Sequence, residues 1–233
     1  MNKKVLWLIA ARCGSKSIIH KNIKLLGGQP LLSYRIESVK ETRSDHSLWI
    51  TTDSEEYASI AQKYGAEVPF IRPKELSTDI ASSVDVVLHA MNYANKSNYK
   101  FDYIGLLEPT SPFITSSQLD GAISLLDENK EASAVVAVRQ SRPHKIFIQK
   151  ESIFLKELSK NLKSLKKLGR QEFEKEITPS GGFYISRWDD FLKMKSFYTS
   201  KTLSFEVDEI SGIEIDEPLD WEFAEFIINK RNK

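Results

Sequence analysis

The chain has 233 residues, of which 41% are hydrophobic and 28% charged, and its formal net charge is +1. This length and composition are those of a soluble globular protein, and we expect one α/β domain over residues 1–233 with a well-buried core. A net charge so near zero supplies no overall field for nucleic acid or an anionic membrane, so neither partner is expected and any anion site must be local.

The single cysteine, Cys13, excludes an internal disulfide and a cysteine-rich zinc module. As a catalytic thiol it would need a nearby base, for which His20 is the candidate. His20, His46 and His89 lack metal-ligand spacing, which favours surface or packing roles. No stretch approaches the length of a transmembrane helix, and the apolar run behind residues 1–4 is too short for a secretory signal, so we expect a cytoplasmic protein.

Strand-like and helix-like segments alternate along the chain, the pattern of a parallel sheet wrapped by helices. Apolar runs predict strands at 5–11, 47–52, 68–71, 103–107, 133–138, 182–186, 202–207 and 212–215. Apolar residues at helical spacing predict helices through Leu32, Ile36 and Val39; Tyr57, Ala61 and Tyr64; Val84, Leu88 and Met91; and Leu119, Ile123 and Leu126. A final helix at 220–229 is expected to bury Leu219, Phe223, Phe226 and Ile227.

The alternation stops between Arg139 and Thr178. Lys and Glu crowd residues 151–176, where four leucines are spaced as on one helix face, namely Leu155, Leu158, Leu162 and Leu165. Such a segment is either a solvated surface helix or an excursion that packs on a second subunit.

The most informative stretch follows the first expected strand. There the apolar run breaks into a short loop with one glycine, two serines and the cations Arg12, Lys16 and Lys21. A loop at the carboxyl end of a parallel strand faces the crevice where open α/β sheets bind ligands. Backbone N–H groups freed by small residues, with cations around them, suit a polyphosphate. The G-x-x-x-x-G-K-[ST] pattern is absent, which excludes a kinase-type phosphate cradle.

A pair of carboxylates near the C-terminus suits a cation. Residues two apart on a strand point to one face, so Glu214 and Asp216 are expected to converge. Mg²⁺ favours one or two carboxylates together with phosphate oxygens and water. The alternative is an exposed acidic strand edge followed by a capped helix.

Four motifs in the same order resemble those of the CMP-sugar synthetases (acylneuraminate cytidylyltransferases). Residues 11–22 resemble Ala-Arg-x-Gly-Ser-Lys-Gly-x-x-x-Lys-Asn, residues 72–79 resemble Arg-Pro-x-x-Leu-(Ala/Ser)-x-Asp, residues 106–112 resemble Leu-Leu-Gln-Pro-Thr-Ser-Pro, and residues 214–216 resemble Asp-x-Asp. The chain departs from these patterns at Ser17 (family Gly), Ile19 (often Pro), Glu108 (Gln) and Glu214 (Asp). Residues 178–182 also lack the Arg and Asn of the family's Arg-Pro-Asn-Gly-Ala.

The resemblance implies a three-layer nucleotide-diphospho-sugar transferase fold, with residues 139–178 projecting as the dimerisation segment of a homodimer. It implies a reaction of CTP with an acidic nine-carbon sugar, aided by Mg²⁺, that yields a CMP-sugar and pyrophosphate. The nucleotide-binding residues implied are Ala11, Arg12, Ser15, Lys16, Lys21, Asn22, Arg72 and Ser82. The catalytic residues are Arg12, Lys21 and Asp216, the sugar-binding ones Glu108, Lys145 and Arg170, and the metal ligands Glu214 and Asp216.

Glu108 bears on which sugar binds. An amide both donates and accepts hydrogen bonds, whereas an ionised carboxylate only accepts. The substrate group at Glu108 should therefore be rich in donors, or Glu108 is protonated, and a legionaminate or pseudaminate fits at least as well as N-acetylneuraminate. Two alternatives stay open: a 3-deoxy-manno-octulosonate cytidylyltransferase, whose Arg-Leu-Pro-Gly-Lys type segment is absent here, and a nucleotide-binding paralogue without catalysis.

Overall fold

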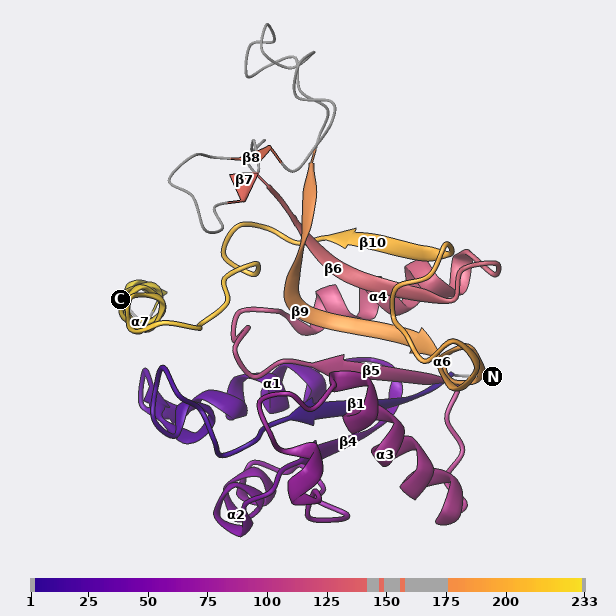
Figure 1. Cartoon of the computed structure of the whole chain (residues 1–233), viewed down its shortest axis with the longest axis horizontal. Helices are drawn as coiled ribbons and strands as arrows, with labels where there is room; N and C mark the ends of the chain where they lie inside the picture. Colours follow the sequence, from indigo (N-terminus) through magenta and orange to yellow (C-terminus); the bar gives the residue numbers. More distant parts are fainter. Residues whose placement is uncertain (1–2, 142–146, 149–155, 158–175, 232–233) are drawn as a thin grey trace, which may run out of the picture.

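The computed structural model describes residues 3–141, 147–148, 156–157 and 176–231. A six-stranded sheet of order β10-β6-β9-β5-β1-β4 forms its centre (Figure 1). The strands are β1 (Lys4–Ala10), β4 (Asp45–Thr51), β5 (Tyr103–Leu107), β6 (Ala134–Gln140), β9 (Ile177–Arg187) and β10 (Thr202–Glu206). In this sheet β9 alone runs antiparallel to its neighbours, while β1–β4, β1–β5 and β10–β6 pair in parallel. The expected mostly parallel sheet is therefore confirmed.

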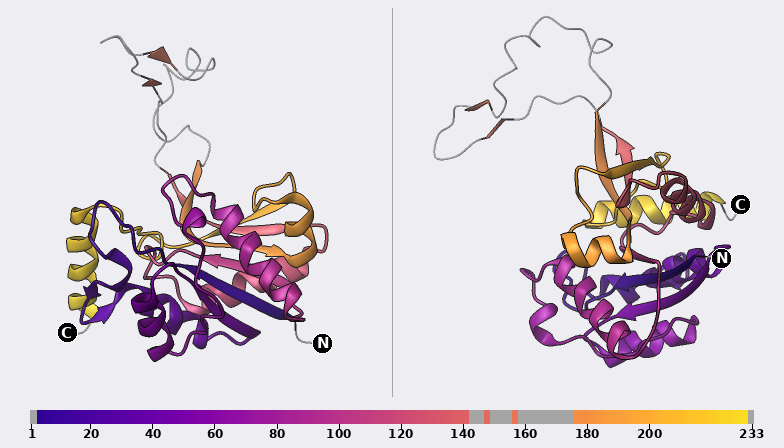
Figure 2. Two further views of the ribbon diagram at one scale, coloured as in Figure 1. Left: turned by 60° about the horizontal axis from the view of Figure 1, so that its bottom comes forward. Right: turned by 90° about the vertical axis from the view of Figure 1, so that its right-hand side faces the viewer.

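Helices cover both faces of the sheet (Figure 2). One face carries α1 (Leu31–Lys40), α2 (Glu55–Lys63) and α4 (Ser116–Glu128). The other carries α3 (Ser83–Lys96) and α6 (Trp188–Met194). Strand β1 shows how the sequence builds both layers: alternate side chains of a strand point to opposite faces, so Trp7 packs with the first set of helices and Leu8 with the second. The three-layer architecture is thus confirmed.

Polar side chains fix where the helices begin. The hydroxyl of Ser54 accepts the backbone N–H of Tyr57 at the start of α2, and that of Ser82 accepts the N–H groups of Val84 and Asp85 at the start of α3. Helix α4 begins with a capping box, in which Thr115 and Gln118 each bond to the other's backbone.

A smaller apolar cluster joins the two ends of the described chain. Helix α7 (Pro218–Arg231) packs on the hairpin of β2 (Leu25–Leu26) and β3 (Gln29–Pro30). The residues of α7 that it buries are Trp221, Ala224, Ile227 and Ile228. The expectation that Leu219, Phe223 and Phe226 are buried is wrong, because they lie on the opposite face of the helix with 73%, 52% and 62% of their surface exposed.

Two expected strands are absent. Near residues 68–71 the chain makes only one bridge, between Trp49 and Glu67, and two residues later comes Pro69, which lacks an N–H. Before residues 212–215 the chain forms a turn, in which the N–H of Gly212 donates to the Asp208 carbonyl. The N–H of Ile215 then donates to the Thr110 carbonyl, and residues 212–215 pair with no strand of the described sheet. The second difference matters for the site, because Glu214 and Asp216 do not sit on a strand.

The two ends of the expected inserted segment meet within the sheet. Arg139 pairs with Thr178, and Gln140 with Ile177, where β6 and β9 run side by side. Beyond them a short antiparallel pair is described, β7 (Phe147–Ile148) with β8 (Lys156–Glu157). The rest of the segment, with its four leucines, lies outside the described residues, and its role in dimerisation stays a prediction.

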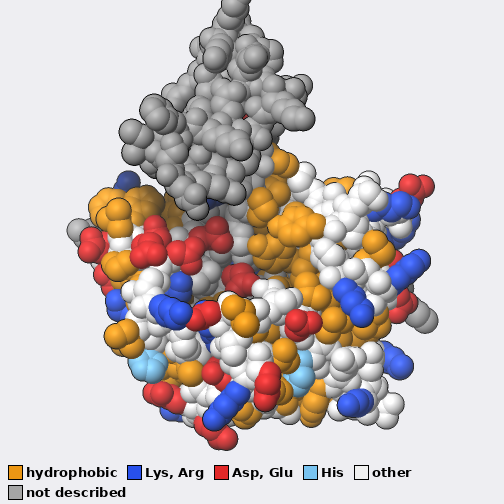
Figure 3. Space-filling view, viewed as in Figure 1, with side chains coloured by type: hydrophobic (Ala, Val, Ile, Leu, Met, Phe, Trp, Pro, Cys, Tyr) orange, Lys and Arg blue, Asp and Glu red, His pale blue; other side chains and the backbone are white. Residues whose placement is uncertain are grey.

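Charges are interspersed on the face shown in Figure 3, with acidic and basic side chains side by side rather than in a field of one sign. Hydrophobic side chains gather over α7, at the upper left of that view. Within the part of the chain that the structure describes, no helix is both long and apolar enough to cross a membrane.

Candidate active site

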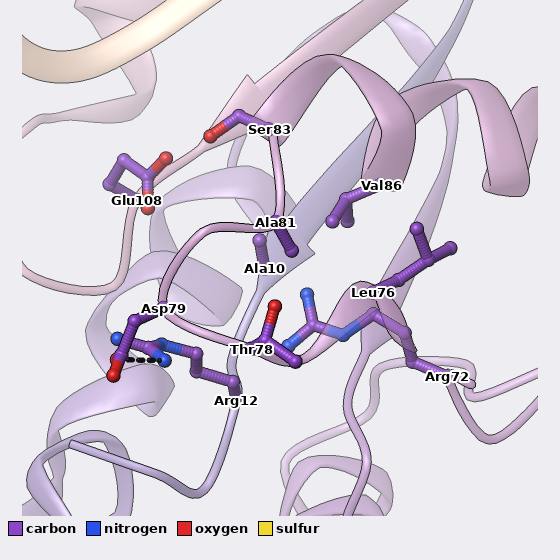
Figure 4. A pocket seen from close by; sticks show the side chains of 10 residues that line it. All are labelled: Ala10, Arg12, Arg72, Leu76, Thr78, Asp79, Ala81, Ser83, Val86 and Glu108. Carbon is purple, nitrogen blue, oxygen red and sulfur yellow. Dashed lines mark hydrogen bonds and ion pairs between the residues drawn. The ribbon is translucent and has the colours of Figure 1, made fainter. Parts of the chain in front are cut away.

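Two adjoining cavities open at the carboxyl ends of β1 and β5, and they share Ala10, Arg12 and Glu108 in their walls. The first, of about 210 Å³, is completed by Arg72, Leu76, Thr78, Asp79, Ala81, Ser83 and Val86 (Figure 4). The second, of about 320 Å³, is completed by Ser15, Lys16, Ser17, Lys21, Asn22, Pro109 and Thr110. The crevice expected at this edge of the sheet is therefore present.

Three cations predicted from the first loop line the second cavity. Arg12 Nη1 lies 2.7 Å from Asp79 Oδ1, and Lys16 Nζ pairs with the other oxygen of the same carboxylate. Asn22 donates its side-chain amide to the Arg12 carbonyl at 2.9 Å, which fixes the backbone that carries the guanidinium. The Asp79 carboxylate thus holds Arg12 and Lys16 near each other.

Asp53 supports the same loop from the end of β4. Its Oδ1 accepts the Cys13 backbone N–H at 3.0 Å and its Oδ2 accepts the thiol at 3.3 Å. Burial and this carboxylate raise the pKa of the Cys13 thiol. His20 contacts Tyr57 at 3.2 Å, and no hydrogen bond joins it to Cys13 among the described residues, so these two do not form a cysteine–histidine pair.

Lys21 links the first loop to the residues before α7. Its ammonium is almost fully buried and donates to the Ile215 carbonyl at 2.8 Å and to Asp216 Oδ1 at 3.2 Å. The Ser17 hydroxyl donates to the Asp216 carbonyl. The chain thereby brings residues almost 200 positions apart into one site.

Arg72 lies beneath the first cavity, with 4% of its surface exposed. Its backbone N–H donates to Thr52 at 2.8 Å, and its Nε donates to the Ser77 hydroxyl at 3.1 Å. Its buried Nη2 has no hydrogen-bond partner among the described residues, and Figure 4 shows the guanidinium directed into the cavity beside Thr78. Burial also lowers the pKa of Arg72. Because Nη2 is buried without a partner, a polar ligand atom placed there would complete a hydrogen bond that the protein leaves unmade.

Glu108 stands between the two cavities. Burial, and then the nearby carboxylate of Glu214, raise its pKa to about 7, although Arg72 and Arg35 favour the ionised form. Arg35 is fully buried and donates to the carbonyls of Ile114 and Gly182 at 3.4 and 3.1 Å. Near neutral pH both protonation states of Glu108 are populated, so the site can offer either an acceptor or a donor there.

Glu214 and Asp216 differ in their surroundings. Glu214 is packed so closely on Gly181 that a Cβ there would overlap its carboxylate, and the positive φ of Gly181, 62°, also favours glycine. Burial and Asp216 raise the pKa of Glu214. The Asp216 side chain is 70% exposed and faces Lys21.

The chemistry of this pair fits Mg²⁺, although the strand geometry expected for it is absent. No group of three or more His, Cys, Asp or Glu side chains in the described ranges is arranged to hold a metal by itself. Two neighbouring carboxylates suffice when phosphate oxygens and water complete the octahedron. A divalent cation would also relieve the repulsion that raises the pKa of Glu214.

The structure brings together most of the residues singled out in the sequence. Ala11 and Ser82 are not among the residues that line the two cavities. Ala11 donates its N–H to the Thr51 carbonyl, and the hydroxyl of Ser82 is engaged as the cap of α3. Lys145 and Arg170, expected at the sugar, lie outside the described residues.

Three residues of the site have no functional role predicted from the sequence: Arg35, Asp53 and Asp79. Asp79 closes the second motif, and Asp53 follows a strand at the ligand-binding edge, so both had a positional signal. Arg35 lies three residues after Leu32 on the apolar face of α1, and a charged residue at a core position was its signal.

Comparison with known proteins is consistent with this geometry. The family model described as cytidylyltransferase matches residues 6–221. The chain is 33% identical to an N-acylneuraminate cytidylyltransferase of Escherichia coli, covering 100% of this chain and 54% of that protein, so it spans about half the length of that relative. It is 28% identical to a CMP-N,N'-diacetyllegionaminic acid synthase of Legionella pneumophila, covering 95% of each.

A solved structure shares the fold. The chain superposes on a CMP:2-keto-3-deoxy-manno-octonic acid synthetase complexed with CTP with a TM-score of 0.72, covering 98% of this chain and 99% of the other at 15% identity. The expected nucleotidyltransferase fold is thereby confirmed. With the family model matched from β1 into α7, the chain belongs to the cytidylyltransferase family of nucleotidyltransferases.

Proposed function

We propose that this protein transfers the cytidylyl group of CTP to an acidic nine-carbon sugar and releases pyrophosphate. The observation that carries the proposal is the grouping of Arg12, Lys16 and Lys21 along one cavity, next to a second cavity into which Arg72 points an unpartnered nitrogen. The relatives named for neuraminate and legionaminate support such a sugar over an octulosonate, since they match at 33% and 28% identity over nearly the whole chain.

In the reaction, the anomeric hydroxyl of the sugar attacks the α-phosphorus of CTP. The new P–O bond forms as the bond to the β-phosphate oxygen breaks, pyrophosphate leaves, and the hydroxyl proton passes to solvent. Arg12, Lys16 and Lys21 stabilise the charge that grows on the departing phosphates. Asn22 holds the backbone of Arg12, and Arg72 binds a polar atom of the nucleotide.

Glu214 and Asp216 would hold Mg²⁺ in this proposal, together with phosphate oxygens. Bound there, the ion would neutralise charge on the triphosphate and lower the pKa of the attacking hydroxyl. Lys21 orients Asp216 through its ion pair of 3.2 Å, so the cation that binds phosphate also fixes a metal ligand.

The proposal extends to the assembly and compartment of the protein. Residues 139–178 leave and re-enter the sheet at neighbouring positions of β6 and β9, which suits a segment that projects toward the second subunit of a homodimer. Within such a dimer Lys145 and Arg170 would serve the carboxylate of the sugar. The enzyme would act in the cytoplasm, where CTP is made.

Pyrophosphate release measured with CTP and Mg²⁺ tests the proposal. The acceptors are N-acetylneuraminate, a legionaminate, a pseudaminate and 3-deoxy-manno-octulosonate, and mass spectrometry identifies the products. A CMP-sugar from one of the three nonulosonates is the expected result. A product from the octulosonate alone would favour the eight-carbon alternative. CTP binding without turnover of any acceptor would instead favour a nucleotide-binding paralogue.

A further inference from the structure

Asp79 has an unusual position for an exposed carboxylate. It lies between the 3₁₀ helix η2 (Lys74–Leu76) and α3, and its side chain is 44% exposed. Even so, both of its oxygens are committed: one to Arg12 at 2.7 Å and the other to Lys16. These cations come from the loop after β1, more than 60 residues away, so the carboxylate bridges two segments of the cavity walls. Figure 4 shows its ion pair with Arg12.

The two cations are the groups on which phosphate binding would depend. Arg12 lines both cavities and Lys16 lines the second. A carboxylate that pairs with a guanidinium and an ammonium offers two anionic oxygens at the spacing in which a phosphate group would offer them. The hydrogen bonds from Lys16 and then Arg12 lower the pKa of Asp79, which keeps the bridging group ionised.

We propose that Asp79 occupies part of the triphosphate site in the ligand-free protein, and that CTP binds by displacing it from Arg12 and Lys16. The inference rests on the proposed function and adds an affinity-determining residue to it. Exposed ion pairs are individually weak, so a triphosphate with several negative charges exchanges for one carboxylate readily. Thr78, Asp79 and Ala81 all line the first cavity, so release of Asp79 would also free the segment that borders the nucleotide.

The alternative is that Asp79 positions Arg12 and Lys16 for the phosphates. The two roles predict opposite changes in CTP affinity when the carboxylate is removed. An internal competitor weakens CTP binding, so its removal strengthens binding; a positioning residue does the reverse. Asp79→Asn keeps the size of the side chain and removes its charge. Because the residue is exposed and belongs to no apolar cluster, the variant is expected to fold.

The test is calorimetric titration of the full chain with CTP at fixed Mg²⁺ and without sugar. Asp79→Asn is expected to bind CTP about fivefold more tightly, the equivalent of one strong exposed ion pair. Affinity for cytidine, which lacks phosphates, should not change. The variant should also lose affinity more steeply with salt, because its CTP contacts no longer replace existing ion pairs.

Glu75→Gln is the matched control. Glu75 is exposed in the same segment, and the substitution changes the net charge by the same amount without touching the two cations. Unchanged or weaker CTP binding by Asp79→Asn would overturn the inference, as would equal tightening by Glu75→Gln. Failure of the unaltered protein to bind CTP would overturn the proposed function itself, so the two failures are distinguishable.

Discussion

Single charges decide the character of this site, and Glu108 is the clearest case. The motif around it otherwise matches the resembled family, yet the carboxylate replaces an amide at the junction of the two cavities. Burial and Glu214 disfavour its ionised form more than Arg72 and Arg35 favour it. The substitution therefore places a costly charge where its protonation state can matter for the substrate.

Glu108→Gln should stabilise the protein, and more so at high pH. The pKa of Glu108 is raised from 4.5 in the unfolded chain to about 7 in the folded one. The folded state thus holds the proton more tightly, so the free energy of unfolding falls as the pH rises between these values. The amide removes this loss, which for such a pKa shift is on the order of 3 kcal/mol once the pH exceeds the folded-state pKa.

Urea unfolding of both proteins at pH 5 and pH 8 measures the effect. The advantage of the variant should be small at pH 5 and larger at pH 8. An advantage that is equal at both values, or greater at pH 5, would show that Glu108 does not ionise against a burial cost.

Asp216→Asn should lower turnover about 100-fold or more, since the neutral amide binds Mg²⁺ weakly and less charge is stabilised in the transition state. It should also raise the Mg²⁺ concentration needed for half-maximal rate. Steady-state pyrophosphate release across a Mg²⁺ series measures both. Glu217→Gln, at the adjacent exposed carboxylate, should retain normal kinetics, and near-normal turnover by Asp216→Asn would refute the metal assignment.

Sequence was informative about these residues where chemistry and position agreed. Arg12, Lys16 and Lys21 follow a buried strand, and such a position predicts the ligand-binding edge. The partners Asp79 and Arg35 were not predictable in the same way. The Asp79 contacts depend on how two distant loops approach each other, and Arg35 is buried because carbonyls of Ile114 and Gly182 happen to receive it.

Among the elements, α7 shows why helical spacing can select the wrong face. Apolar residues occur on both sides of this helix, so the spacing is compatible with two orientations. The hairpin β2–β3 and Phe113 receive the side of Trp221 and Ile227, and Leu219, Phe223 and Phe226 turn outward. Tertiary packing decides which face of α7 is buried, and the spacing of apolar residues in the sequence does not contain that information.

Two substitutions in α7 test this orientation. Trp221→Ala should destabilise the protein by about 3–5 kcal/mol, because it empties a buried volume against the hairpin. Phe223→Ser, on the exposed face, should change the free energy of unfolding by no more than about 0.5 kcal/mol. Denaturant unfolding monitored by far-UV circular dichroism compares them, and a greater loss from Phe223→Ser would mean that the helix is turned the other way.

At the scale of the whole molecule, the site is where the N-terminal and C-terminal parts of the chain come into contact. The sheet orders β1 next to β5, and the first loop meets the residues before α7 through Lys21, Ile215 and Asp216. Strand β5 and helix α1 can be predicted from the pattern of their own residues. No local pattern predicts the contacts of Lys21 with Ile215 and Asp216, which join segments almost 200 residues apart. A ligand bound between them contacts parts of the chain that separate on unfolding.

CTP with Mg²⁺ should therefore raise the midpoint of thermal unfolding. A ligand present at 100 times its Kd and absent from the unfolded state adds about 2.7 kcal/mol, which in a chain of this size corresponds to about 5–10 °C. Differential scanning calorimetry measures the shift, with cytidine at the same multiple of its own Kd as the control for binding without phosphates.

Comparing the thermal shifts of CTP and cytidine shows where the triphosphate binds, separately from how tightly each ligand binds. At equal saturation both ligands should give the same shift, but the CTP shift alone should shrink as salt rises at fixed CTP concentration, because exposed charges are screened. Lys21→Met should reduce the CTP shift at fixed concentration and leave the cytidine shift intact. A CTP shift that is insensitive to salt and to Lys21 would mean that the triphosphate binds away from this loop, and would remove the link between the closure of the fold and the chemistry.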